Sequence, residues 1–293
     1  MIVAGAWLAC SEPSRAPAAE IEAETATEAE TEAETETEAE TEAEADTETE
    51  AVADAITLEV RVDNAAHEGP AGAPHAILHV PAGLDPERRV SLVVFLHGFS
   101  GCARVLALSG DVACRPGAST MRGWGLAERH DEAGTNSVLV VPQLAWMARD
   151  GSPGRFGRTG AYRAFLEELL AGPLAEPLGG RRALDDLGVT LVAHSAGYQT
   201  ALAILEHGRV PVDAVVLFDA LYGGTDRFAA WLADDEHRRL VSLYTGRGST
   251  YRENTALDRL TSGRAEVRRS PHPHGAIPRL QLADVLGELL AAR

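Results

Sequence analysis

Ser195 lies in the stretch Thr190–Ile204, TLVAHSAGYQTALAI, where an apolar run gives way to helical spacing. Small residues flank it, with Ala193 two positions before and Gly197 two positions after. A sharp strand-to-helix turn requires them because neighbouring backbones come close there, and the strained turn exposes the serine hydroxyl. We therefore predict a nucleophile, the alternative being a structural turn serine. The adjacent His194 is expected to point away and to support packing.

The segment FLHGFSG, residues 95–101, ends an earlier buried run and is the candidate for a second loop at the active site. Acyl transfer needs backbone N–H groups aimed at the developing oxyanion. We expect one donor to be the N–H of Ala196 and the other to be the N–H of Phe99. Gly98 would let the chain approach closely, and His97 would brace the loop through hydrogen bonds. The alternative is an ordinary glycine turn.

A general base is expected in SPHPHGAIPRL, residues 270–280. Histidine is the most frequent general base because its pKa lies near neutrality. His274 is preferred over His272, since Gly275 gives its loop the freedom to reach inward. The alternative is an exposed histidine on a proline-rich loop.

An imidazole base needs a carboxylate that fixes its tautomer and stabilises the imidazolium. Asp219 directly follows the apolar run AVVLF and is the preferred acid. Glu253 is the next choice, and Asp258 and Asp226 are further alternatives.

These residues must be positioned by alternating strands and helices. Continuous apolar runs predict strands that are buried on both faces, and helical spacing predicts amphipathic helices between them. The order implies a mostly parallel sheet with helices on both faces and an antiparallel edge. Strands are expected over residues 56–64, 75–80, 90–98, 137–143, 188–197, 213–220, 239–246 and 265–270, and helices over 124–134, 161–174, 196–208, 226–237, 253–263 and 277–292.

The combination resembles the α/β-hydrolase family, over one domain at residues 55–293. The resemblance rests on His97-Gly98 after the third strand, then Ser195, an acid and His274 in that chain order. It implies an eight-stranded, mostly parallel sheet with helices on both faces, and no cofactor. It also implies that Ser195 is the nucleophile and His274 the base, with an oxyanion hole formed by the backbones of Phe99 and Ala196.

Two features depart from the family pattern. Ala193 stands where glycine is commoner, and the turn tolerates this. Asp219 would follow the sixth strand, whereas most members place the acid after the seventh, where Glu253 lies. The acid therefore stays open between these two residues.

The resemblance implies a serine hydrolase that cleaves a carboxylic ester of a small or medium soluble substrate through an acyl-enzyme. Fold alone does not name the substrate. The alternatives are a serine peptidase or amidase acting on cell-envelope peptides, and a catalytically dead binding protein on the same fold.

Two long segments, residues 100–124 and 146–162, are the places to look for substrate contacts. Trp124, Trp146 and Phe156 could line an acyl or ring pocket, and Arg155 and Arg158 could meet a carboxylate or phosphate. Solvated arginines and partly buried aromatic residues are the equally open alternative.

The charge of the chain is concentrated at its N-terminal end. The formal charge is −18; residues 1–54 contain 17 acidic residues and the single base Arg15, whereas the remaining 239 residues have 27 acidic residues and 25 arginines. Residues 11–54 are rich in Glu, Ala and Thr and are expected to be a disordered linker. The near-neutral remainder carries no basic footprint for nucleic acid.

Residues 1–10 resemble a truncated signal that ends in Leu8-Ala9-Cys10, as in a bacterial lipoprotein. Cys10 would then be lipidated, and the protein would be exported and anchored to a membrane, or periplasmic or extracellular. The alternative is a disordered terminus with an incidental cysteine. Cys102 and Cys114 would form a disulfide in an oxidising compartment. Two cysteines at this spacing lack further ligands, so we expect no metal site, and we expect a monomer.

Overall fold

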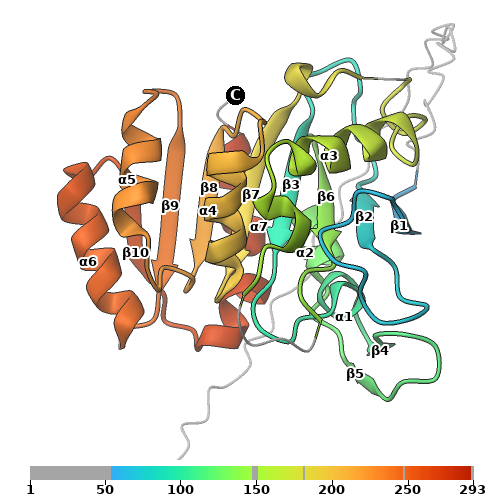
Figure 1. Ribbon diagram of the computed structural model, residues 1–293, viewed down its shortest axis with the longest axis horizontal. Helices are drawn as coiled ribbons and strands as arrows, with labels where there is room; N and C mark the ends of the chain where they lie inside the picture. Colours follow the sequence, from blue (N-terminus) through green and yellow to red (C-terminus); the bar gives the residue numbers. More distant parts are fainter. Residues whose placement is uncertain (1–53, 147–150, 181, 247, 292–293) are drawn as a thin grey trace, which may run out of the picture. The chain divides into compact units, whose positions relative to one another are not determined.

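A computed structural model describes residues 54–146, 151–180, 182–246 and 248–291 (Figure 1). Eight strands form one sheet in the order β1-β2-β6-β3-β7-β8-β9-β10. The strands from β6 to β10 in this order are parallel, and β1 and β2 form the antiparallel edge. The bounds are β1 Ile56–Val60, β2 Ala76–Val80, β3 Ser91–Leu96, β6 Ser137–Pro142, β7 Gly188–His194, β8 Ala214–Phe218, β9 Arg239–Tyr244 and β10 Glu266–Arg269.

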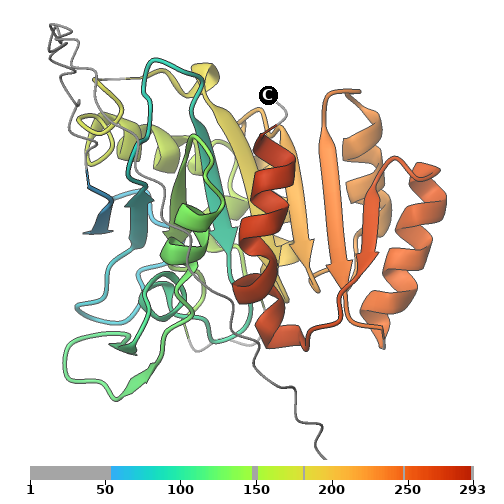
Figure 2. The same ribbon diagram turned by 180° about the vertical axis from the view of Figure 1, so that it is seen from behind.

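Helices cover both faces of the sheet (Figures 1 and 2). One apolar core lies between the sheet and α3 Ala161–Ala171, α4 Gly197–His207, α5 Thr225–Ala233 and α6 Ser249–Thr261. A second core lies on the other face, beneath α1 Ala103–Ala107, α2 Leu126–Glu132 and α7 Ile277–Leu290. The predicted fold class, an α/β-hydrolase fold with a mostly parallel eight-stranded sheet, is confirmed.

The central strands are buried along their whole length, as their continuous apolar sequences predict. Every residue of β3, β6, β7 and β8 is buried. Because these strands are parallel, the loops that follow β3, β7, β8 and β9 emerge at one edge of the sheet. This edge gathers the segments that begin at residues 97, 195, 219 and 245.

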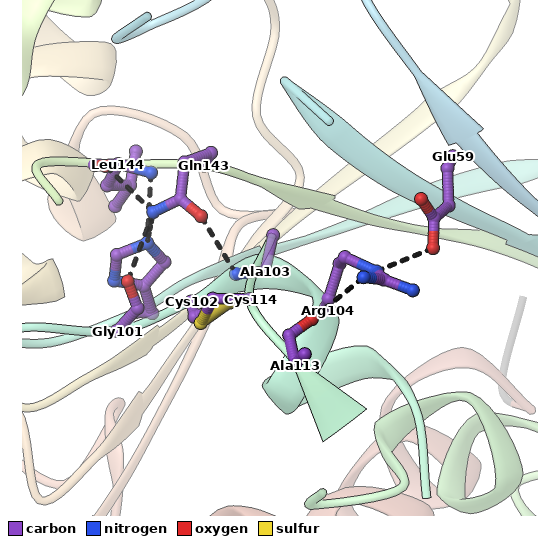
Figure 3. Close-up of a disulfide and its surroundings, with 10 residues drawn as sticks. Glu59, Gly101, Cys102, Ala103, Arg104, Ala113, Cys114, Gln143 and Leu144 are labelled. Atoms are coloured by element: carbon purple, nitrogen blue, oxygen red, sulfur yellow. Dashed lines mark hydrogen bonds and ion pairs between the residues drawn. A yellow bond between two sulfur atoms is a disulfide. The ribbon is translucent and has the colours of Figure 1, made fainter. Parts of the chain in front are cut away.

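The segment 100–124, which was expected to be a long loop, has structure of its own. It contains α1 and a two-stranded antiparallel ribbon of β4 Asp111–Ala113 and β5 Thr120–Arg122. Cys102 and Cys114 form a disulfide across it, as predicted (Figure 3). Arg104 links this segment to the sheet. Its guanidinium donates hydrogen bonds to the Ala113 carbonyl at 2.8 Å and to Glu59 of β1 at 2.7 Å.

Two element boundaries differ from the sequence prediction for local reasons. Helix α6 begins at Ser249 rather than 253, directly after Gly248, whose φ of 84° ends the preceding loop. The first strand ends at Val60 rather than 64. Beyond it, the backbone of Val62 is hydrogen-bonded to the His75 ring. Three short 3-10 turns complete the described elements: η1 Gly154–Gly157, η2 Leu184–Asp186 and η3 His274–Ala276.

The segment 1–10, the linker 11–53 and the lipidation candidate Cys10 lie outside the described residues. Within the described part of the chain, none of the helices combines the length and the apolar character that a membrane span requires.

Candidate active site

Ser195 occupies a strained turn between β7 and α4. Its φ is 55°, in the left-handed region that non-glycine residues avoid, and Ala196 begins the helix. A side chain at Gly197 would overlap the backbone carbonyl of Leu96, which explains the glycine there. Ala193 is fully buried between Leu96 and the next strand, and its small side chain fits the turn.

Asp219 and His274 form a direct pair at the same edge. The His274 Nδ1 lies 2.7 Å from the Asp219 Oδ2, although 55 residues separate them in sequence. Asp219 is 2% exposed and also has a positive φ, of 45°. It accepts hydrogen bonds from the backbone N–H of Thr245 at 3.0 Å and from the hydroxyl of Thr245.

The environment of Asp219 keeps its carboxylate ionised. Burial is the largest influence and would raise its pKa, but hydrogen bonds from His274, Thr245 and Thr250 outweigh it and lower the pKa to about 2. An anionic acceptor fixes the proton of His274 on Nδ1, because a neutral imidazole that donates from one nitrogen presents a lone pair on the other. The remaining nitrogen, Nε2, is therefore the basic one.

His194 holds His274 beside the turn that carries Ser195. The two imidazole centroids lie 4.6 Å apart, and the His194 Nε2 donates to the backbone carbonyl of His274 at 3.2 Å. On its other side, His194 packs edge-on against Trp124 at 5.4 Å. Burial, with a contribution from His274, lowers the pKa of His194 to about 3, so its ring is neutral. His194 is thus a positioning residue, in keeping with its predicted supporting role.

Tyr222 is a residue of this site that we did not predict from the sequence. Its side chain interacts with the Ser195 hydroxyl, and its ring lies 6.4 Å from the His274 ring. Burial and the charge of Asp219 raise the pKa of Tyr222, and the interaction with Ser195 offsets part of this rise. The only sequence signal was its place in DALYGG, three residues after the acid.

The loop after β3 passes directly beside the serine. A side-chain carbon at Gly98 would lie 2.7 Å from the Ser195 Cβ and 3.1 Å from its Oγ, so this approach requires glycine. Among the described residues, neither the N–H of Phe99 nor that of Ala196 has a hydrogen-bond acceptor. Gly98, the residue before Phe99, thus lies against Ser195, and Ala196 follows Ser195 directly in the chain.

His97 braces this loop with both ring nitrogens. Its Nδ1 donates to the Gly98 carbonyl at 2.8 Å, and its Nε2 accepts from the Leu144 N–H at 2.9 Å. Burial lowers the pKa of His97 to about 4. The hydrogen bond to Gly98 acts in the opposite direction, and the charge of His67 lowers the pKa a little further. Gln143, which the sequence did not single out, joins the same network through Gly101 and Ala103 (Figure 3).

Other predicted residues are not part of this arrangement. Glu253 accepts a hydrogen bond from Thr225 instead of meeting the imidazole. His272 has its backbone N–H bonded to the Ser270 hydroxyl and is not paired with Asp219. Of the predicted acids and bases, Asp219 and His274 are thus the two that are paired with each other.

The pocket predictions are corrected in two places. Phe156 is fully buried against Tyr162 and Phe165, so it belongs to the core and lines no pocket. Both arginines are exposed. Arg155 donates a hydrogen bond to the Asp63 carbonyl and lies 3.5 Å from Glu68. Trp146 packs against the disulfide cluster, and Trp124 reaches the site through His194.

No protein-family model matches the chain, and no curated protein does. Solved structures with a similar fold include a fluorophosphonate-binding serine hydrolase from Staphylococcus aureus, with 12% identity and a TM-score of 0.48, covering 80% of this chain and 98% of that one. An S-formylglutathione hydrolase from the same species has 13% identity and a TM-score of 0.49, with the same coverage. A feruloyl esterase module from Clostridium thermocellum, complexed with sinapinate, has 11% identity and a TM-score of 0.47, covering 72% and 81%. At these identities the similarity concerns the fold alone.

Proposed function

We propose that this chain is a serine hydrolase that cleaves a carboxylic ester of a small or medium soluble substrate. One observation carries the proposal. The imidazole of His274 is held at 2.7 Å by a buried carboxylate, beside a serine whose strained backbone presents its hydroxyl. A buried acid, an imidazole and a partly buried serine together form the arrangement that activates a hydroxyl for acyl transfer.

The roles follow from the hydrogen bonding. Because the His274 Nδ1 is engaged by Asp219, its Nε2 takes the proton of the Ser195 hydroxyl as the oxygen attacks the ester carbonyl. The N–H groups of Ala196 and Phe99 stabilise the oxyanion. The imidazolium then protonates the leaving alcohol, and an acyl-enzyme remains. Water, deprotonated by the same nitrogen, attacks this ester and releases the acid and the serine.

The surroundings of His274 provide space for a substrate. A surface pocket of about 800 Å³ adjoins it and is lined by Thr245, Gly246 and residues 269–274. Two large side chains at the same edge are exposed, Phe99 at 50% and Tyr222 at 41%. The open pocket and these exposed aromatic side chains support a soluble substrate of limited size rather than a long acyl chain.

Substitution of Ser195 by alanine tests the proposal. The expected result is that Ser195→Ala abolishes hydrolysis of p-nitrophenyl acetate and butyrate while the Tm and the circular dichroism spectrum stay unchanged. Ser109→Ala, at an exposed position away from the site, should keep the full rate. Full activity in Ser195→Ala would remove this serine from the mechanism.

Two alternatives are separated by simple assays. A serine peptidase or amidase would cleave peptide or anilide substrates at least as fast as esters of the same acyl group. A catalytically dead binding protein would cleave neither and would not react with a fluorophosphonate.

Export of the protein is a further part of the proposal. The disulfide between Cys102 and Cys114 supports it, because disulfides persist in oxidising compartments. Anchoring through a lipidated Cys10 rests on the sequence resemblance alone, and intact mass measurement of the protein from its native membrane would test it. We also propose that the catalytic domain acts as a monomer.

A further inference from the structure

A cluster of three side chains lies away from the serine site, between the antiparallel edge and helix α2. His79 comes from β2, and His130 and Asp131 come from α2. One possible ligand atom from each residue lies within 4.8 Å of the other two. The imidazole centroids are 5.7 Å apart and nearly perpendicular, and the His79 Nε2 lies 2.8 Å from the Asp131 Oδ1.

His130 has a ring nitrogen without a partner in a buried position. The residue is 1% exposed, and its Nε2 lies 2.8 Å from the Ser137 hydroxyl, which in turn lies 2.7 Å from the hydroxyl of Thr135. Its Nδ1 has no hydrogen-bond partner among the described residues. A buried polar atom without a partner is costly, and such an atom calls for an explanation such as an ion.

The hydroxyls leave lone pairs where an ion would need them. With its Nε2 donating to Ser137, His130 presents the Nδ1 lone pair. His79 is held in the same way, because its Nδ1 lies 2.8 Å from the Thr57 hydroxyl and its Nε2 faces Asp131. Metal-binding histidines almost always donate their second nitrogen to such a partner.

We propose that His79, His130 and Asp131 bind a divalent transition-metal ion, with Zn²⁺ as the best match. Two imidazoles and one carboxylate suit Zn²⁺, and water would fill the fourth position of a tetrahedral site. The side chain of Asp131 is 40% exposed, so its side of the cluster is open to solvent. The sequence alone does not indicate this site, because 51 residues separate the two histidines.

The ion has a structural role. His79 pairs with Leu139 near the start of β6, and β2 runs antiparallel to β6. The cluster therefore lies toward the N-terminal ends of the parallel strands, whereas Ser195 follows the C-terminal end of β7. Bound metal would tie strand β2 to α2, which packs beside α7 on the face that Figure 2 shows in front. Its effect should be on stability and not on ester hydrolysis.

Titration of the full, tag-free chain with Zn²⁺ tests the proposal. After chelator treatment, calorimetry should show one ion bound per chain, and saturating Zn²⁺ should raise the Tm by about 5–10 °C. Co²⁺ should occupy the same position and give the visible absorption of a low-coordinate site. Ester hydrolysis should keep its rate within about twofold with or without metal, so this test does not depend on the proposed function.

Substitutions on α2 supply the matched comparison. Asp131→Asn should weaken Zn²⁺ binding at least tenfold and remove most of the Tm rise, with little effect on the metal-free fold because this side chain is partly exposed. Glu132→Gln, the next residue, carries the same change of charge outside the cluster and should bind as the wild type does. Absence of stoichiometric binding at 100 µM Zn²⁺, or equal binding by Asp131→Asn and Glu132→Gln, would overturn the proposal.

Discussion

Backbone strain in this molecule is concentrated at the residues proposed for the chemistry. Of the five non-glycine residues with positive φ in the described chain, Ser195 and Asp219 are proposed for the chemistry, and Ser100 follows Phe99 in the loop after β3. They occupy the turns after β3, β7 and β8. Each such conformation costs on the order of 1–3 kcal/mol and persists only where its surroundings over-determine it. This strain supports the proposal that these turns serve function.

Asp219→Asn tests the assignment of the acid. The amide keeps the shape but can donate to the His274 Nδ1, which would stabilise the wrong tautomer, so kcat should fall by about 10³–10⁴-fold. Glu253→Gln is the control, because Glu253 bonds Thr225 and should change kcat less than about twofold. Steady-state kinetics on p-nitrophenyl butyrate measure both. A large loss in Glu253→Gln with a small loss in Asp219→Asn would reverse the assignment.

Tyr222→Phe tests the residue that the sequence did not reveal. The ring and its contact with His274 are kept, whereas the phenolic partner of the Ser195 hydroxyl is lost. One hydrogen bond is worth about 0.5–1.5 kcal/mol, so kcat/KM should fall about two- to tenfold. An unchanged kcat/KM would show that the phenol does not position the nucleophile.

At the scale of elements, the sequence was most informative where burial dictates composition. Continuous β-branched runs identified β3, β6, β7 and β8, and the longer helices α2, α3 and α4 between them had clear apolar spacing. Short pieces such as α1, β4 and β5 escaped prediction. Elements of three to five residues carry too little periodicity, and tertiary ties such as the disulfide and Arg104 hold them in place.

The same limit applies to the site. Ser195 could be predicted because its turn has a local signature, and Asp219 because an acid follows an apolar strand. The choice between Asp219 and Glu253 depended on which loop reaches His274, a contact across 55 residues. Gln143 and Tyr222 have no local signature, because their roles arise only when distant strand ends meet.

The disulfide between Cys102 and Cys114 cross-links the segment that contains α1 and β4. Cys102→Ser with Cys114→Ser should lower the free energy of unfolding by about 3 kcal/mol, since cross-linking a loop of this size restricts the unfolded chain by that amount. Urea unfolding of the oxidised protein and of the variant measures the difference. Equal stabilities would show that the cross-link does not constrain the unfolded chain.

For the whole molecule, buried neutral histidines make the free energy of unfolding depend on pH below neutrality. Burial lowers the pKa of His97 to about 4 and that of His194 to about 3. In the unfolded chain both have a pKa near 6.5, so the unfolded state binds more protons below that pH. Their contribution to stability is complete above pH about 6.5 and is lost as the pH falls toward 4 and 3.

Each of these histidines should therefore cost up to about 1.4 kcal/mol of unfolding free energy per pH unit below 6.5. Urea unfolding at pH 7.5, 6.0 and 5.0 should show stability falling steadily. His194→Phe, which removes one such group, should show a shallower decline. A flat profile between pH 7.5 and 5.0 would contradict the burial of these rings as neutral groups.

Ser195 is proposed as the single activated hydroxyl of the protein, and covalent labelling is the measurement that tests this proposal. A fluorophosphonate should modify the full chain at one site per molecule. Mass spectrometry should place the label on the tryptic peptide 183–209, in which Ser195 is the only serine. We expect labelling of this peptide, with loss of both label and ester hydrolysis in Ser195→Ala. Hydrolysis by a protein that is labelled elsewhere, or not at all, would contradict it.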